Sequence, residues 1–324
     1  MRPSSWACRH DGAAHANAAQ RFRGVKMHSE EITARSHTTS PVIVACLAAT
    51  WFVWGSTYLV IKLALVSFPP FFQGGTRFLV AGTLLLLWVW LRRQELPTLV
   101  QWRNAVIVGA VMLGGNMGGV VYAEQTVASG LVVTFIAIVP ALMTIANLPF
   151  GIRPSRLEVL GIGLGIVGVL LLVRGEAFTV SPAGLIAITI AALGFSIGSV
   201  LSQHVFRLAP AFAGFASQMI CAGAVLMLLS LLAGETFHWP PQPLAAAAWM
   251  YLVVFGSLIA FCAYMVLLAR TRPALASSNS FANPVIGTFL GVSLGGEKVT
   301  SQEWLAVGII VLGVTMLILG RPGR

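Results

Sequence analysis

The chain has 324 residues, of which 57% are hydrophobic and 9% charged, with a formal net charge of +10. A soluble domain carries about 25% charged residues, so this composition excludes an ordinary soluble protein and predicts a polytopic, all-α membrane protein. No basic run with interleaved aromatic residues is present in the sequence, so the positive charge does not indicate nucleic-acid binding. The four cysteines form no C-x-x-C pair, and we expect neither a disulfide framework, a metal site nor a cofactor.

Residues 1–40 differ from the rest of the chain. They are polar and contain six Lys and Arg residues against three acidic residues. No short apolar region follows a brief basic start, so this segment does not read as a signal peptide. We expect either a disordered cytoplasmic tail or an over-long gene start, because Met27 offers a start closer to the first apolar segment.

Ten apolar segments follow. A helix needs about 20 mainly apolar residues to cross the hydrocarbon core of a bilayer. The predicted spans are 42–66, 71–91, 104–124, 127–150, 157–174, 182–203, 211–233, 245–269, 274–296 and 301–320. Short separators with Gly, Pro and charged residues divide them.

The basic residues between the spans orient the array. Ten arginines flank the even-numbered loops or follow the last span, whereas the odd-numbered loops hold only Arg174 and Lys298. Basic residues collect in cytoplasmic loops, so this asymmetry predicts that both termini lie in the cytoplasm.

The two halves of the sequence are similar to each other. The aligned pairs are Gly55 with Gly198, Pro140 with Pro284, Gly163 with Gly308, and Gly168 with Gly313. Each half contains five predicted helices, and an odd number places the two halves upside down relative to each other. Inverted repeats are the architecture of many secondary transporters, with the substrate site near the bilayer midplane between the repeats. The sequence therefore predicts two repeats, 41–175 and 176–324.

Several motifs also resemble a known family. The segments "WGSTYLVIK", "GTRFLVAG", "NPVIGTFLGVSLGGEKV" and "EWLAVGIIVLGV" resemble the EamA-type members of the drug/metabolite transporter superfamily, and within it the YedA-like group of exporters. The resemblance covers residues from about 42 to 320. It implies a ten-helix fold with both termini in the cytoplasm and a central cavity that the first helix faces.

Three charged residues lie within the predicted spans and away from the loops: Lys62, Arg77 and Glu124. Such residues are costly in a membrane and are candidates for function. With the N-terminus inside, all three lie in the outer half of the membrane. Either Lys62 extends to the interface while Glu124 neutralises Arg77, or the three line the outer mouth of a cavity and bind a polar or carboxylate group. Glu124 is the candidate if transport is coupled to protons.

Aromatic and polar residues offer further candidates for the substrate path. Trp54 and Tyr58 share one face of the first helix with Trp51, and this stripe faces the cavity, packs between helices or faces lipid. Polar side chains within the spans either line the path or form hydrogen bonds between helices. They are Asn116, Ser199, Gln218, Asn279 and Asn283.

Pro140 and Pro284 lie inside apolar segments, where a proline removes a backbone donor and interrupts or kinks a helix. Because the two prolines are paired in the repeat, we interpret them as hinges on which each half bends, with a static kink as the alternative.

These features favour a secondary transporter of the inner membrane. We expect an exporter of small, amino-acid-like or amphipathic metabolites that works by alternating access, and the partners are a small-molecule substrate and the lipid bilayer. An uncoupled facilitator or pore is the alternative. A membrane-embedded enzyme acting on lipid needs clustered His, Asp or Glu, and the only Asp of the chain is Asp11. The sequence does not select among substrates, nor between monomer and dimer.

Overall fold

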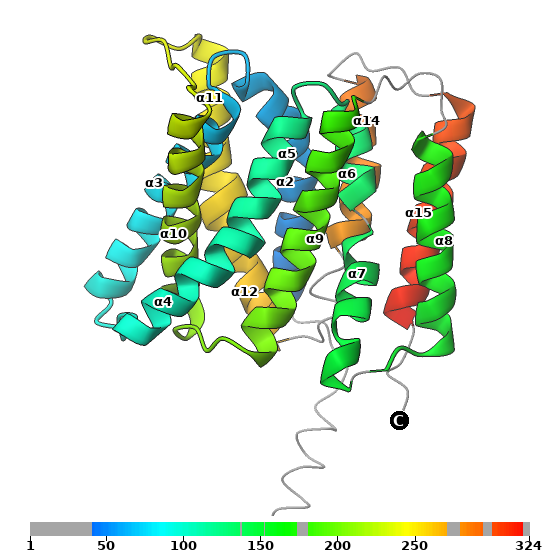
Figure 1. Ribbon diagram of the computed structural model, residues 1–324, viewed down its shortest axis with the longest axis horizontal. Coiled ribbons are helices and arrows are strands. Elements are labelled where there is room, and N and C mark those ends of the chain that lie inside the picture. Colours follow the sequence, from blue (N-terminus) through cyan, green and yellow to red (C-terminus); the bar gives the residue numbers. More distant parts are fainter. Residues whose placement is uncertain are drawn as a thin grey trace, which may run out of the picture. The chain divides into compact units, whose positions relative to one another are not determined.

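The computed structural model describes residues 41–136, 138–151, 153–173, 181–270, 279–293 and 300–319. In these ranges the chain forms helices joined by turns and short irregular connections (Figure 1). The predicted tail 1–40, the two basic residues predicted for the odd-numbered loops and the arginines after the last span lie outside the described residues.

The first half of the chain begins with two long helices, and a third follows with three joined parts. The first two are α2 (Pro41–Ala64) and α3 (Pro70–Leu91). The third combines α4 (Leu99–Val108), the π-helical η1 (Gly109–Gly115) and α5 (Asn116–Ala123). The remaining elements are α6 (Ser129–Ile136), α7 (Val139–Ala146), the 3₁₀ turn η2 (Leu148–Phe150) and α8 (Arg156–Val173).

The second half repeats this order. It begins with α9 (Pro182–His204) and α10 (Ala211–Leu232). A composite helix follows, made of α11 (Pro243–Tyr251), the π-helical η3 (Leu252–Ile259) and α12 (Ala260–Arg270). The last described elements are α14 (Asn279–Ser293) and α15 (Ser301–Leu319).

Local chemistry explains where several helices begin. Pro70, Pro182 and Pro243 lie in the first turn of α3, α9 and α11, where a missing backbone N–H costs nothing. Thr98 and Gln101 form a capping box, in which each side chain accepts a hydrogen bond from the other residue's backbone N–H. For this reason the third span begins at Leu99, earlier than the predicted 104.

Six helices in the described ranges are long and apolar enough to cross a membrane. They are Pro41–Ala64, Pro70–Leu91, Leu99–Ala123, Pro182–His204, Ala211–Leu232 and Pro243–Tyr264. The other predicted spans hold α6 with α7, α8, α14 and α15. The span predicted at 127–150 contains two helices rather than one, since α6 ends at Ile136 and α7 begins at Val139. Pro140 lies in the first turn of α7, whereas α14 continues as one helix through Pro284.

Corresponding helices of the two halves pack against each other. α3 packs along α10, α8 along α15, and α6 against α14; the α8–α15 pair stands side by side in Figure 1. Other contacts between the halves are reciprocal, and we call them exchanged contacts. α3 of the first half contacts η3 of the second half, and the equivalent helix α10 of the second half contacts η1 of the first half. The sequence offset that places Gly55 on Gly198 also places Gly109 on Leu252, so the two π-helical segments begin at equivalent positions.

The start of α3 is tied to the connection that follows α10. The carboxylate of Glu235 accepts the backbone N–H groups of Phe71 and Phe72, at 3.0 and 2.8 Å. These N–H groups have no partner within the helix, and a negative charge at a helix N-terminus is favourable. Phe237 stacks on Phe68 and Phe72, with ring centroids 5.1 and 4.9 Å apart, and extends the contact.

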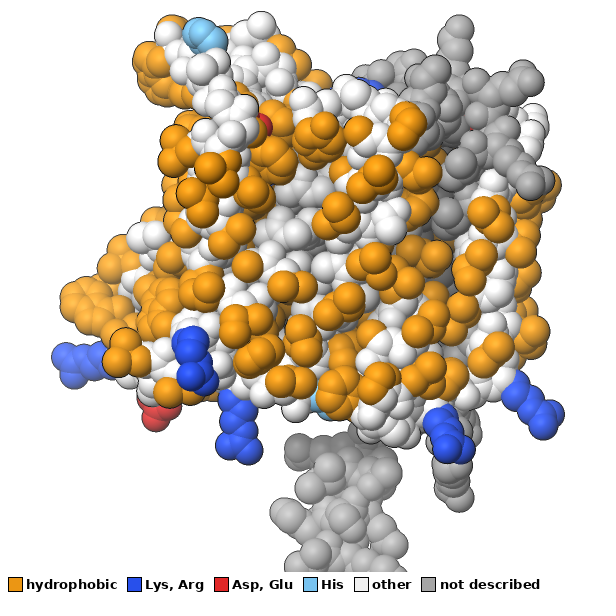
Figure 2. Space-filling model, viewed as in Figure 1, with side chains coloured by type: hydrophobic (Ala, Val, Ile, Leu, Met, Phe, Trp, Pro, Cys, Tyr) orange, Lys and Arg blue, Asp and Glu red, His pale blue; other side chains and the backbone are white. Residues whose placement is uncertain are grey.

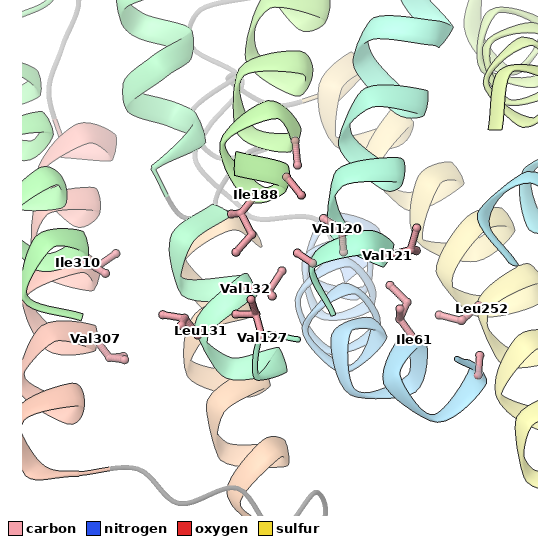
Figure 3. Packing of buried hydrophobic residues seen from close by; sticks show 14 of the residues in the cluster. Ile61, Val120, Val121, Val127, Leu131, Val132, Ile188, Leu252, Val307 and Ile310 are labelled. Carbon is pink, nitrogen blue, oxygen red and sulfur yellow. The ribbon is translucent and has the colours of Figure 1, made fainter. Parts of the chain in front are cut away.

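Basic side chains are separated from hydrophobic side chains on the surface (Figure 2), and the interior is packed with apolar side chains. Hydrophobic side chains cover the face in Figure 2, and most Lys and Arg side chains visible there lie along its lower edge. In the interior, Ile61 of α2 packs with Val120 and Val121 of α5 in a cluster that reaches α6, α9 and α15 (Figure 3).

Candidate functional site

Side chains from both halves of the chain enclose a cavity of about 90 Å³. The first half contributes Trp54, Thr57, Tyr58, Ile61, Arg77, Asn116, Met117, Val120, Ile136 and Val139. The second half contributes Phe195, Phe261, Asn279, Ser280 and Asn283. The lining, largely apolar with a few convergent polar groups, has the character of a small-molecule binding site, but the cavity is smaller than the roughly 300–1,000 Å³ of a site for a drug-sized ligand.

One wall of the cavity is aromatic. The indole of Trp54 meets Phe261 edge-on, with centroids 5.0 Å apart and an interplanar angle of 70°. The centroid of Tyr264 is 5.3 Å from that of Trp54. The indole N–H of Trp54 donates a hydrogen bond to the backbone carbonyl of Gly256, at 3.0 Å. Ring packing and this hydrogen bond together fix the orientation of the indole.

Arg77 places a cationic group in the cavity, and the residue is only 1% exposed. Its Nε–H donates to the hydroxyl oxygen of Ser257 at 2.7 Å, and Nη1 lies 3.8 Å from the sulfur of Met117. The guanidinium carbon is 5.5 Å from the ring centroid of Phe78. A hydroxyl and a thioether are neutral and weak acceptors, whereas a guanidinium has five N–H donors and a full charge. The site is therefore suited to an anionic group.

A glycine of the π-helical segment η3 makes this arrangement possible. A Cβ atom on Gly256 would lie 2.9 Å from Nη2 of Arg77 and 3.1 Å from the methyl group of Thr57. The guanidinium can occupy its observed position because Gly256 has no side chain. π-helical segments occur often at functional sites, and here one segment accepts hydrogen bonds from both Trp54 and Arg77.

Two asparagines on α14 are among the other polar residues that line the cavity. Asn279 and Asn283 are one helical turn apart and are 8% and 6% exposed. The side-chain oxygen of each is buried and has no hydrogen-bond partner among the described residues. Asn116, which also lines the cavity, differs because its amide nitrogen donates to the carbonyl of Ala191 at 3.2 Å. Buried amide oxygens without a donor are costly, and those of Gln73, Asn104 and Gln218, which do not line the cavity, share this feature.

The structure brings together six of the candidates selected from the sequence. They are Trp54, Tyr58, Arg77, Asn116, Asn279 and Asn283. Pro140 follows Val139, which also lines the cavity. The side chain of Pro284 lies outside the part of the chain that the structure describes.

Four other candidates are not among the residues that line the cavity in the described part of the chain, and one of them, Gln218, is buried within α10. Glu124 is 3% exposed, at the C-terminal end of α5, where it interacts electrostatically with Tyr58. Tyr58 is one of the lining residues, whereas Glu124 is not. Lys62 is half-buried near the end of α2, and Ser199 is buried within α9.

Some contributors could not be selected from the sequence. Phe195 and Phe261 look like ordinary apolar residues of a span, and the sequence does not say which face of their helices meets the cavity. Ser257 is one serine among many, and only the fold places it against Arg77. Within the ranges the structure describes, no group of three or more His, Cys, Asp and Glu side chains could hold a metal ion.

Comparisons with known proteins agree with this architecture. The model of the EamA-like transporter family matches residues 39–174 and 182–319. The chain is 39% identical to the uncharacterized inner membrane transporter YedA of Escherichia coli K12 over 280 residues, which cover 86% of this chain and 91% of the relative. It is 24% identical to PecM of Dickeya dadantii over 271 residues, covering 82% and 88% of the two chains.

A solved crystal structure shares the fold with a TM-score of 0.63 at 21% identity, covering 85% of this chain and 95% of the other. The family match covers most of the chain in two parts, and the relatives match along nearly their whole length. These matches point to a multi-pass transporter of the inner membrane rather than to an enzyme. The chain belongs to the EamA-like transporter family.

Proposed function

We propose that this protein is a secondary transporter that exports small, amino-acid-like or amphipathic metabolites across the inner membrane by alternating access. The observation that carries the proposal is the buried guanidinium of Arg77 in a cavity to which both halves contribute. A buried charge is expensive and is kept in membrane proteins chiefly where it serves a function. The aromatic wall of the cavity suits the apolar part of a substrate, and Arg77 suits its carboxylate.

The proposed topology has ten spans as two inverted repeats, with both termini in the cytoplasm. The exchanged contacts of α3 with η3 and of α10 with η1 support the repeat, because a two-fold relation requires such pairs. The basic side chains along one edge of the surface support the orientation (Figure 2). In such an arrangement the two halves offer equivalent but opposed packings, which is the basis of alternating access.

Paired hinges at Pro140 and Pro284 are part of the proposal. The interruption between α6 and α7 beside the cavity supports a hinge at Pro140. Replacing either proline by alanine should lower the transport rate while membrane insertion and thermal stability stay near those of the unaltered protein. If insertion and transport fall together, the prolines are static kinks.

The test begins with a thermal-stability screen of the purified protein against a panel of metabolites. A compound that raises the unfolding temperature is then used in proteoliposomes. A carrier accumulates labelled substrate by counterflow against excess unlabelled substrate inside, whereas a pore does not. Absence of counterflow with measurable flux would favour the facilitator.

The matched variants are Arg77→Gln and Arg92→Gln. Hydrogen bonds to charged groups contribute about 1.5–3 kcal/mol, so Arg77→Gln should weaken the binding of a carboxylate substrate by about 10- to 150-fold. Arg92 lies at the end of α3, exposed against Trp88, so its replacement should leave binding unchanged. Equal loss in both variants would contradict the assignment of Arg77.

A further inference from the structure

We infer that α7 and α9 form a latch that closes the cavity toward the cytoplasm, with His204, Asn147 and Phe150 as the residues that hold it closed. The inference rests on the proposed transport function and orientation, and it names the contact that must open when the cavity opens inward. α7 belongs to the first half and α9 to the second, and the two helices pack against each other. Their C-terminal ends lie at the lower edge of Figure 1, along which Lys and Arg side chains lie in Figure 2.

The latch joins the ends of the two helices through one histidine. The side-chain nitrogen of Asn147 donates to the backbone carbonyl of Met143 at 2.8 Å, so its side-chain oxygen is left to accept. Nε2 of His204 lies 2.9 Å from this oxygen and therefore carries the hydrogen. The imidazole also stacks on the ring of Phe150, with centroids 4.6 Å apart and an interplanar angle of 18°. His204 thus makes a polar and an aromatic contact between the halves.

A second hydrogen bond continues this contact to the level of the cavity. The hydroxyl of Ser196 donates to the backbone carbonyls of Ala192 at 2.7 Å and of Val139 at 3.3 Å, and Val139 lines the cavity. Val139 and Asn147 are eight residues apart on the chain. Ser196 and His204 have the same separation, which is a rise of about 12 Å along a helix. The helices therefore stay in register from the cavity to their ends, and separating these ends opens a way to the cavity.

The residues aligned with the latch in the other half cannot form one. The alignment of the two halves places Ile61 on His204 and Gly291 on Asn147. Neither isoleucine nor glycine has a side chain that forms hydrogen bonds. In a carrier with two opposed packings, a contact that exists at one end alone favours the state in which that end is closed. The latch therefore biases the empty carrier toward the state that is closed to the cytoplasm.

The experiment measures access to the cavity from the cytoplasmic side and needs no substrate. Val139→Cys is the reporter, in a protein whose native cysteines are replaced, and a membrane-impermeant maleimide is applied to inside-out vesicles. Adding His204→Ala should raise the labelling rate by about 5- to 30-fold, because a hydrogen bond and an aromatic contact that favour the closed state are lost together. Labelling in right-side-out vesicles should not rise.

Two milder variants separate the contacts. Phe150→Leu removes the aromatic partner alone, and His204→Gln keeps a donor without the ring, so each should give a smaller rise than His204→Ala. Both side chains are exposed, and their replacement leaves the interior unchanged, so these variants serve if the alanine variant does not fold.

Thr126→Val is the matched control. It removes the 2.8 Å hydrogen bond between the hydroxyls of Thr126 and Ser181, which also joins the first half to α9 but at the opposite end of that helix. The labelling rate of the reporter in inside-out vesicles should not rise in this variant.

An unchanged labelling rate in His204→Ala and Phe150→Leu would overturn the inference, as would an equal rise in Thr126→Val. A rise confined to right-side-out vesicles would also contradict it, because the latch would then close the outer side. These rates do not depend on transport. Failure of the latch therefore leaves counterflow to decide the proposed function, and absence of carrier-type transport for every compound removes that function while the labelling result stands.

Discussion

At the scale of single residues, Gly256 and Ser257 position the side chain of Arg77, and the sequence does not reveal this role. Arg77 is conspicuous in the sequence because a charged residue inside an apolar segment is rare. Its orientation depends on the hydroxyl of Ser257 and on the space above Gly256, which come from a helix far along the chain. Sequence reasoning can select a charge in the membrane, but only tertiary packing decides what holds it.

Gly256→Ala tests this arrangement. The added methyl group would stand 2.9 Å from Nη2 of Arg77, so the guanidinium must move. The end of a long side chain can shift at little cost, and we therefore expect a small change in thermal stability but a loss of affinity for carboxylate ligands. A thermal unfolding scan with and without ligand measures both. Unchanged affinity would show that Arg77 does not need this position.

Glu124 is the test of proton coupling. It is buried at the end of α5 and interacts electrostatically with Tyr58, which lines the cavity. If its protonation drives transport, Glu124→Gln should abolish the dependence of the transport rate on pH while ligand binding persists. Proteoliposome transport at several pH values measures this, and a pH response like that of the unaltered protein would end the hypothesis.

At the scale of elements, the glycines of α8 and α15 behave alike in the two halves. A Cβ on Gly168 would lie 2.5 Å from Ile310, and one on Gly313 would lie 2.7 Å from the carbonyl of Gly161. Gly163 and Gly308, by contrast, have nothing within 4 Å. The two glycines of each aligned pair therefore have similar surroundings in the two halves. Close approach of the helices at small residues accounts for Gly168 and Gly313, but not for Gly163 and Gly308.

These glycines give a matched pair of substitutions on one helix. Gly168→Ala should destabilise the protein by about 1–3 kcal/mol, since a methyl group must be forced into a packed contact. Gly163→Ala should be neutral or stabilising by up to about 1 kcal/mol, because alanine has the higher helix propensity. Thermal unfolding in detergent compares them. Similar losses for both would show that α8 and α15 are held by something other than this approach.

The helices themselves could largely be predicted from the sequence, and Pro140 signals the interruption between α6 and α7, but the π-helical interruptions could not be predicted. Apolar length and polar separators are sufficient to place α2, α3, α9 and α10. The π-helical segments η1 and η3 are apolar runs without any sequence signal of their own. The early start of α4 at Thr98 depends on a capping box that an apolarity count does not see.

At the scale of the whole molecule, the exchanged contacts between the halves are the strongest sign of internal symmetry. Sequence alignment suggested it from a few glycines and prolines, and the packing of α3 with α10 and of α8 with α15 extends it to whole helices. The cavity itself breaks that symmetry, since Arg77 and the asparagine pair come from different halves and differ in chemistry. An alignment of the halves could not have located the site for this reason.

Cysteine labelling tests the orientation. After replacement of the native cysteines, Gln94→Cys lies in the exposed connection between α3 and α4, and His238→Cys in the exposed connection between α10 and α11. With both termini in the cytoplasm, a membrane-impermeant maleimide should label the second variant in intact cells and the first only after permeabilisation. The reverse pattern would contradict the proposed orientation.

The two hydrogen bonds from the backbone of Phe71 and Phe72 to the carboxylate of Glu235 have a mechanical consequence. They fasten the start of α3 to the chain that leaves α10, and the two helices also pack along each other. We expect α3 and α10 to tilt as one rigid body, so Arg77 travels with a helix of the opposite half. On the proposed mechanism, opening and closing are then taken up elsewhere, and we propose Pro140, in the first turn of α7, as one such place.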